Sequence, residues 1–327
     1  MSVTQSIKRP LVVLTGPTAA GKTKLSIALA KTIDGEILSA DSMQVYKHMD
    51  IGSAKIRPEE MQGVPHHLID ILEPWEEFNV VVFQKRCLEC MEQIYDRGHI
   101  PILVGGTGFY IQAVLRGIDF TENEENTEYR EKMEQLAKEK GPEVLHDMLR
   151  KIDPVSADNI HANNIKRTIR ALEYYEFTGE PISTHNEREK ERTSPYNFSY
   201  FVLTDDREKL YVRIENRIDE MLSEGLVEEV RSLKTKGCHR GMVSMQGLGY
   251  KEILEYLDGE CSLEEAVYTL KRDTRHFAKR QLTWFRRENE VTWLDKQQFD
   301  YDEEKILEYM IKELGEKGIY EKQQSQQ

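Results

Sequence analysis

Residues 11–23 read LVVLTGPTAAGKT, an apolar run followed by a loop with two glycines, a lysine and two threonines. The apolar part has the composition of a buried strand, and the residues after it, KLSIALAKTI, have helical periodicity. The loop between them matches G-x-x-x-x-G-K-[ST], the phosphate-binding P-loop, in the strand-to-helix setting that the motif requires. Backbone N–H groups, the helix start and the lysine all favour an anion there. We therefore predict phosphate binding by Gly16, Pro17, Thr18, Ala19, Ala20, Gly21, Lys22 and Thr23, with magnesium held by Thr23.

The residues around this loop predict an α/β core. EILSA (36–40) and IPILV (100–104) have the composition of further strands, and FNVVVFQKRCLECMEQIYDRG (78–98) has a helical pattern between them. Alternating strands and helices are typical of a parallel sheet flanked by helices. SYFVLT (199–204) and VTWL (291–294) resemble a returning strand and a last edge strand. The expected fold is a P-loop NTPase-like sheet.

The strand signal fades from residue 119 to residue 195, where the chain becomes strongly charged and helical. We predict an all-helical insertion over 119–195. The catalytic core with its C-terminal helices then comprises residues 1–118 and 196–327.

Composition limits the class of protein. The formal net charge of −13 argues against a protein that coats nucleic-acid duplexes nonspecifically, because phosphate neutralisation dominates such binding. No apolar run approaches the roughly 18 residues that span a membrane, and the four cysteines are sparse. Cys87 and Cys90 lie within a helical run without a second ligand pair, so we expect no metal there. We expect a cytoplasmic protein outside the membrane, with a monomer as the default state.

Two polar residues follow the other predicted strands. Asp41 ends the strand 36–40, and Thr107 belongs to Gly105-Gly106-Thr107-Gly108 after the strand 100–104. Because the C-terminal ends of parallel strands gather at one edge, both would lie beside the P-loop. Asp41 can act as a base or, alternatively, cap a following helix, and Thr107 can contact a phosphate oxygen. The strand 100–104 ends in glycine, without the acid that NTP-hydrolysing P-loop proteins usually carry there to hold magnesium.

Basic residues cluster locally within the acidic chain. Lys166, Arg167 and Arg170 share one helical face and can meet a phosphate backbone, or alternatively form a solvated face. Residues 271–287 contain seven Lys or Arg and one Asp. In that run Arg272, Arg275, His276 and Lys279 form one stripe, and an apolar stripe predicted to be core contains Leu270, Phe277 and Trp284.

Arg213 lies in an amphipathic helix after the returning strand. An arginine at that place can reach a diphosphate leaving group. An ion pair with Glu215 or Glu220 is the alternative that the spacing leaves open.

Six stretches together resemble the tRNA dimethylallyltransferase family, also called tRNA isopentenylpyrophosphate transferases, over nearly the whole chain. In the family's order they are GPTAAGKT, ADSMQVY, GGTGFY, NNIKRTIRALE, MQGLGYKE and TRHFAKRQLTWFRR. The resemblance implies that dimethylallyl diphosphate, not ATP, occupies the P-loop with Mg²⁺. The implied acceptor is N6 of adenine 37, next to the anticodon of tRNAs that read codons beginning with U. The chain has no C-terminal zinc-finger extension of the eukaryotic kind, which implies a bacterial form.

The resemblance also implies a role for each matching residue. Asp41 becomes the base at N6, while Lys22, Thr23, Thr107 and Arg213 hold diphosphate and magnesium. His276 stands where the family commonly has glutamine. Contacts with the anticodon stem-loop are implied for Asp41, Ser42, Met43, Gln44, Asn164, Ile165, Lys166, Arg167, Thr168, Gln246, Tyr250, Arg275, His276, Lys279 and Arg280.

Three other functions remain possible at this stage. An adenylate dimethylallyltransferase shares the loop but needs no RNA-binding surface. A small-molecule kinase would place ATP in the P-loop, against which the glycine at 105 counts. An RNA-binding ATPase switch would carry out no transfer at all.

Overall fold

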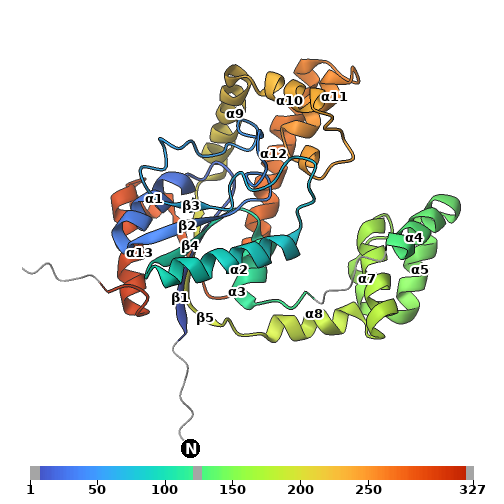
Figure 1. The fold of residues 1–327 in the computed structure, drawn as a ribbon, viewed down its shortest axis with the longest axis horizontal. Helices are drawn as coiled ribbons and strands as arrows, with labels where there is room; N and C mark the ends of the chain where they lie inside the picture. The colour runs from blue at the N-terminus through green and yellow to red at the C-terminus, as the bar shows by residue number, and fades with distance from the viewer. Residues whose placement is uncertain (1–7, 121–126, 322–327) are drawn as a thin grey trace, which may run out of the picture. The chain divides into compact units, whose positions relative to one another are not determined.

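The computed structural model describes residues 8–120 and 127–321 (Figure 1). The chain divides into two compact units. One comprises Met1–Leu115 with Pro195–Gln327, and the other comprises Arg116–Ser194. We call them the core unit and the insertion. Residues 121–126 of the predicted helical stretch lie outside the described residues.

A six-stranded parallel sheet forms the centre of the core unit, in the order β3-β2-β4-β1-β5-β6. This arrangement confirms the predicted α/β fold and the edge position of the last strand. His66–His67, which carried no strand signal, forms the short opposite edge. The strands are β1 (Arg9–Thr15), β2 (Gly35–Ala40), β3 (His66–His67), β4 (Ile100–Gly105), β5 (Tyr196–Thr204) and β6 (Val291–Asp295).

Helices cover both faces of the sheet, which explains why its strands are almost continuously apolar. Successive side chains of β1 alternate between the two sides, so that Leu11 and Val13 join one apolar cluster and Val12 and Leu14 join the other. The second cluster contains α1 (Lys22–Ile33) and α13 (Glu303–Glu316). The first contains α2 (Val80–Asp96), α3 (Gly108–Arg116), α9 (Arg207–Glu224), α10 (Leu226–Thr235), α11 (Tyr250–Leu257) and α12 (Leu263–Phe285). Two short 3-10 helices, η1 (Ser244–Gln246) and η2 (Lys296–Phe299), lie between these elements.

The insertion has an apolar cluster of its own, which includes Leu145, Leu149 and Leu172. Its two ends are tied to each other, because Arg192 Nη1 donates to the carbonyl of Gly117 and Arg116 Nη1 donates to the carbonyl of Arg192. The helices are α4 (Thr127–Lys140), α5 (Pro142–Ile152), α6 (Pro154–Asn159), α7 (Ile165–Thr178) and α8 (Ile182–Glu191).

Among the helices of residues 8–120 and 127–321, none combines the length and the apolar character needed to cross a membrane.

Candidate active site

The P-loop, residues 16–23, connects β1 to α1 at the C-terminal edge of the sheet. Gly16 and Gly21 have φ of +144° and +92°, values that glycine adopts without strain. A Cβ on Gly16 would also overlap the carbonyl of Leu203 in β5. Lys22 Nζ donates to the carbonyls of Gly16 at 3.0 Å and Pro17 at 2.8 Å. The ammonium therefore lies within the loop, against its backbone oxygens.

The charge of Lys22 is only marginally stable in this position. Burial and, to a smaller extent, the nearby Arg217 guanidinium lower its pKa to about 8, while Asp41 opposes both effects. A bound anion would favour the charged ammonium. The protonation of Lys22 therefore depends on what occupies the loop.

Asp41 follows β2, two strands away from the P-loop strand. Its Oδ1 accepts the N–H of Met43 at 2.8 Å and that of Gln44 at 3.4 Å, which closes a turn. No helix follows in residues 41–65, so the helix cap weighed from the sequence is not formed. The same side chain lines a cavity that also contains Thr18 and Thr107. The carboxylate is thus oriented by its own turn and faces the space beside the P-loop.

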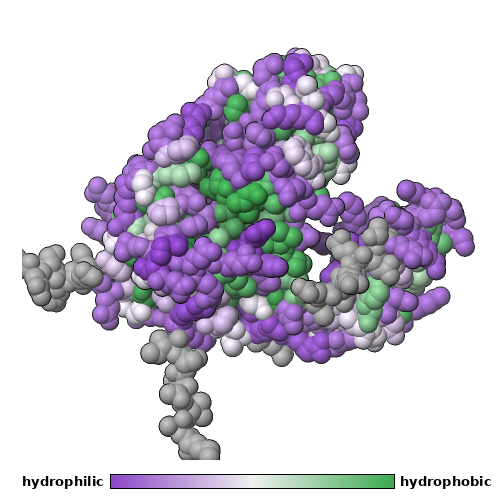
Figure 2. Space-filling view, in the orientation of Figure 1, coloured by the Kyte–Doolittle hydropathy of each residue, from purple (hydrophilic) through white to green (hydrophobic). Residues whose placement is uncertain are grey.

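The cavity has a volume of about 570 Å³ and lies entirely within the core unit. One part of its lining is polar, with Thr18, Asp41, Thr107, Arg217 and Gln281. The remainder contains the apolar side chains of Phe78, Tyr110, Ile214, Ile218, Met221, Leu270 and Phe277. Figure 2 shows apolar residues gathered between the positions of α12 and α3, surrounded by hydrophilic ones. A ligand with a charged end and a short hydrocarbon end matches this division.

Arg217, which the sequence analysis did not single out, faces the cavity. Its Nη1 donates to Thr18 Oγ1 at 3.3 Å, and burial lowers its pKa, with Asp41 opposing the shift. Arg213, one helical turn earlier, is used differently. It donates from Nε to the carbonyl of Ala19 at 3.0 Å and pairs with the buried Asp205 at 2.7 Å.

The two arginines of α9 lie differently with respect to the cavity, and the diphosphate contact expected of Arg213 stays a prediction. Among the described residues that line the cavity, the arginines are Arg217 and Arg280, and Arg213 is not one of them. Its partner is Asp205 at the end of β5, not Glu215 or Glu220. The four-residue spacing placed both arginines on one helical face and was the signal available for finding Arg217.

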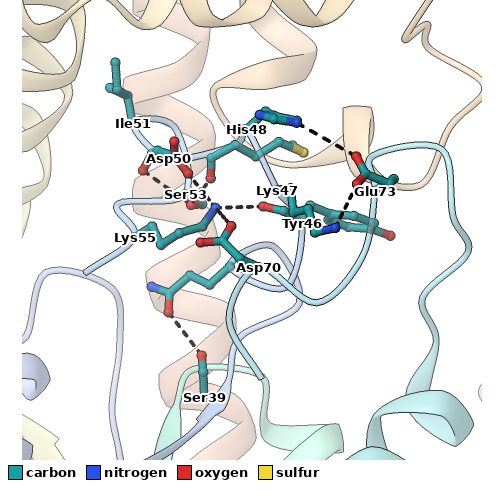
Figure 3. Close-up of polar contacts among 12 residues, drawn as sticks. Ser39, Tyr46, Lys47, His48, Asp50, Ile51, Ser53, Lys55, Asp70 and Glu73 are labelled. Atoms are coloured by element: carbon teal, nitrogen blue, oxygen red, sulfur yellow. Dashed lines mark hydrogen bonds and ion pairs between the residues drawn. The ribbon is translucent and has the colours of Figure 1, made fainter. Parts of the chain in front are cut away.

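The segment after β2, residues 41–65, has no helix and is held by polar contacts (Figure 3). Lys55 is central to them, with only 5% of its side chain exposed. Its ammonium donates to the carbonyl of Tyr46 at 2.7 Å and to the carboxylates of Asp50 at 2.6 Å and Asp70 at 2.5 Å. We call this segment the β2 loop. Lys55 thus joins three positions of the chain, Tyr46, Asp50 and Asp70, and so stabilises the turn that begins at Asp41.

Tyr250 is a further support of the β2 loop, and its predicted tRNA contact is corrected. The side chain is fully buried, so it cannot touch RNA. Its hydroxyl donates to Glu229 at 2.7 Å and accepts the N–H of Ser53 at 3.1 Å. Thr168 in the insertion is corrected for the same reason, since it is fully buried and its hydroxyl donates to the carbonyl of Asn164.

Glu229 of α10 holds the β2 loop from the other side. Its carboxylate accepts three successive backbone N–H groups, at Asp50, Ile51 and Gly52, with distances of 2.8–3.0 Å. Glu229→Gln replaces one acceptor oxygen by an NH₂ that faces these donors. We expect the free energy of unfolding to fall by about 2 kcal/mol, the size typical of hydrogen bonds to a charged group.

Urea denaturation of the full chain measures this loss. Glu228→Gln is the matched control, because Glu228 is exposed one position earlier on α10 and pairs only with Arg231 of its own helix among the described residues. Equal stability of the two variants would contradict the role given to Glu229.

Most of the predicted RNA-facing residues of α12 are exposed. His276, Lys279 and Arg280 line a shallow hollow together with Thr283, Trp284 and Arg287. Arg275 instead forms an ion pair with Glu215 at 2.5 Å. The apolar stripe predicted as core divides: Leu270 is buried, Phe277 lines the cavity, and Trp284 packs on Gly108 and Phe109.

The other predicted tRNA contacts lie in two separate places. Ser42, Met43 and Gln246 line the cavity, while Gln44 accepts from Ser39 and donates to the carbonyl of Ala54. In the insertion, Asn164, Lys166 and Arg167 are exposed and Ile165 is half-buried at the start of α7. Arg170 pairs with the buried Glu173.

Magnesium has a plausible set of oxygen donors here. Thr23 presents an exposed hydroxyl at the first turn of α1, and Asp41 supplies a carboxylate at the same sheet edge. Within the described part of the chain, no three His, Cys, Asp or Glu side chains gather as metal ligands. Mg²⁺ that takes few protein oxygens and completes its shell with phosphates and water fits such a site.

Comparisons with known proteins give one consistent result. A family model described as IPP transferase matches residues 44–288, and one described as isopentenyl transferase matches residues 10–71. The tRNA dimethylallyltransferase of Lachnoclostridium phytofermentans is 63% identical over 311 residues, covering 95% of this chain and 99% of the relative.

Two solved structures extend the comparison. The tRNA isopentenylpyrophosphate transferase of Bacillus halodurans is 47% identical, with a TM-score of 0.72 and coverage of 95% of this chain and 98% of that one. A eukaryotic dimethylallyltransferase described as acting on tRNA is 31% identical, with a TM-score of 0.74, covering 88% of this chain and 74% of its own.

Proposed function

Because this chain belongs to the tRNA dimethylallyltransferase family, we propose that it transfers the dimethylallyl group of dimethylallyl diphosphate to N6 of adenine 37 in tRNAs that read codons beginning with U. One observation carries the assignment of the site. The Asp41 carboxylate and the P-loop residue Thr18 line a single cavity, and another part of its wall is apolar.

Asp41 acts as the base in this proposal. An exocyclic adenine amine is a weak nucleophile, because its lone pair is delocalised into the ring. Removal of an N6 proton as the N6–C1 bond forms therefore lowers the barrier. The C1–O bond breaks in the same displacement and its electrons leave with the diphosphate. The hydrogen bond from the N–H of Met43 holds Oδ1 and thereby fixes the direction of the carboxylate.

The leaving diphosphate gains charge, which the P-loop N–H groups, Lys22 and Arg217 stabilise. Donors that are already in place cost no reorganisation at the moment of reaction. Thr23 would hold Mg²⁺, which would supply further positive charge to the phosphate oxygens. The apolar wall with Phe78, Tyr110 and Ile218 takes the hydrocarbon and excludes water.

RNA binding is assigned to two exposed surfaces. The hollow on α12 offers His276, Lys279 and Arg280, and the start of α7 offers Lys166 and Arg167. Such contacts to phosphate fix the position of an RNA without reading its sequence. The adenine must leave its stack to enter the cavity, which favours an open anticodon loop over a duplex.

A labelling experiment tests the function directly. The purified chain is incubated with Mg²⁺, labelled dimethylallyl diphosphate and an unmodified anticodon stem-loop that carries adenine 37, with AMP in a parallel tube. We expect label in the RNA, lost when that adenine is replaced by guanine. Label in AMP alone would move the chain to the adenylate dimethylallyltransferases, and label in neither would refute the proposal.

The lowered pKa of Lys22 predicts a pH dependence of diphosphate binding. The free protein loses the Lys22 charge above a pKa of about 8, whereas bound phosphate raises that pKa. The contribution of Lys22 to affinity is therefore constant well below pH 8, and above it binding must return a proton to Lys22. We expect the dissociation constant for inorganic pyrophosphate to rise up to about tenfold per pH unit above 8.

Calorimetric titration from pH 7 to 9.5, without RNA, measures this dependence. Lys22→Arg serves as the control, since a guanidinium stays charged over the whole range. The same steep rise in that variant, or a flat profile in the natural chain, would rule out Lys22 as its source.

The hollow on α12 predicts salt-dependent RNA binding. Lys279→Gln and Arg280→Gln should each weaken binding of the stem-loop and reduce the slope of log affinity against log salt by about one. Fluorescence anisotropy at several salt concentrations gives the slope. Lys312→Gln on α13, an exposed lysine outside the hollow, should leave the slope unchanged. If the three variants behave alike, α12 does not contact phosphate.

A further inference from the structure

Gln281 of α12 joins two separate loops of the active site. Its side chain amide uses both of its ends on backbone: Oε1 accepts the N–H of Thr18 in the P-loop at 2.9 Å, and Nε2 donates to the carbonyl of Gly106 at 3.0 Å. Only 6% of the residue is exposed, and it lines the cavity. A buried polar group with both ends satisfied holds its partners in one relative position.

The second loop is shaped to receive this side chain. A Cβ at Gly106 would overlap Nε2 of Gln281, and a Cβ at Gly108 would overlap the ring of Trp284. Gly106 and Gly108 of the GGTG loop, residues 105–108, therefore let α12 approach the backbone closely. Gly106 has no left-handed φ, so the approach of Gln281, not the conformation of the backbone, is the reason for glycine there.

We propose that Gln281 is a positioning residue that fixes the P-loop against the GGTG loop and so sets the geometry of the diphosphate site. The proposal rests on the function proposed above. Thr18 belongs to one loop and Thr107 to the other, and both line the cavity beside Asp41. Donors that stabilise a leaving group work only if they are held in place before the reaction, and small misplacements are costly.

An amide suits this position better than other side chains of its length. Glutamate keeps the acceptor for the N–H of Thr18 but places an oxygen against the carbonyl of Gly106 and adds negative charge near the diphosphate. Methionine fills a similar volume and forms neither bond. Gln281→Met therefore removes the connection with little change in packing.

Two measurements test the hydrogen bonds of Gln281 without depending on the transfer reaction. In Gln281→Met, backbone hydrogen exchange of the P-loop peptide that contains Thr18 should quicken in the absence of ligand, by about tenfold. The dissociation constant for inorganic pyrophosphate should rise by a similar factor. Gln281→Glu should bind pyrophosphate more weakly still, although it keeps one of the two bonds.

Transfer kinetics complete the test. We expect the KM for dimethylallyl diphosphate to rise about tenfold in Gln281→Met, the loss expected for one or two hydrogen bonds. Stem-loop affinity should stay within twofold. Gly106→Ala should raise this KM to the same extent, because the added methyl group displaces the Gln281 amide from the carbonyl of Gly106. The double variant should have a KM no higher than either single variant, because all three break the same connection between the two loops.

The same substitution at an exposed site, Gln93→Met on α2, is the matched control and should behave as the natural chain. Unchanged exchange at the P-loop in Gln281→Met, or fully additive effects of the two variants, would overturn the proposal. A natural chain that fails to modify the stem-loop would refute the proposed function instead. Exchange and pyrophosphate binding would still report on Gln281.

Discussion

Asp41→Asn is expected to slow dimethylallyl transfer by roughly 10³- to 10⁴-fold, while the affinity for the anticodon stem-loop stays within a few-fold. The upper part of the range known for general base catalysis is appropriate, because the amine has little reactivity without loss of its proton. Asparagine is nearly the same shape and can still accept the N–H of Met43, which Asp41 accepts at 2.8 Å. The turn is therefore kept, while the negative charge and the capacity to take a proton are lost.

Single-turnover rates with saturating diphosphate measure the chemical step. Asp41→Ala is the comparison, because it removes both the base and the acceptor of the turn. If the role is catalytic, asparagine and alanine should be similarly slow, whereas a role in the turn alone would leave asparagine active. Near-normal turnover of Asp41→Asn would exclude Asp41 as the base.

Arg217→Gln is expected to lower kcat/KM for dimethylallyl diphosphate by roughly 10²- to 10³-fold, the cost of removing one preorganised donor from a developing anion. Arg217 lines the cavity, and its contact with Thr18 Oγ1 is long, at 3.3 Å. Its charge is thus available to a ligand. Removal of a cation that burial already penalises should leave the protein folded.

Arg213→Gln is the contrasting variant on the same face of α9. It would leave the buried Asp205 without its ion pair and the carbonyl of Ala19 without its donor. We therefore expect a lower midpoint of thermal unfolding together with a smaller kinetic effect than in Arg217→Gln. Thermal melts and steady-state kinetics on both variants separate the two roles. The opposite ranking in kinetics would return the diphosphate to Arg213.

The sequence was sufficient for five of the six strands and for the loops at the C-terminal edge of the sheet. Strong apolar runs fixed β1, β2 and β4, and parallel pairing then brought the P-loop, Asp41 and Thr107 to one edge. These inferences depend only on short-range pattern and on a general rule of parallel sheets. They needed no knowledge of which side chain meets which.

The sequence could not show which of several neighbouring side chains faces the cavity. Arg213 and Arg217 share a helical face, and only the packing of α9 against the P-loop decides which one faces the cavity. Tyr250 lies in a stretch that the family resemblance associates with RNA, yet Glu229 from another helix draws its hydroxyl into the interior. The role of Gln281 could likewise not be predicted, because its hydrogen-bond partners lie 263 and 175 positions away in the sequence. Such long-range contacts leave no periodic trace.

The tied ends of the insertion have a consequence for how this protein was assembled. The chain enters the insertion near Arg116 and leaves near Arg192, and these residues bond to each other and to Gly117. The insertion also has an apolar cluster of its own. To the core unit, the whole insertion is therefore equivalent to a short hairpin-like bridge. A gene could gain, lose or exchange it in a single recombination event, without rebuilding the sheet that carries the chemistry.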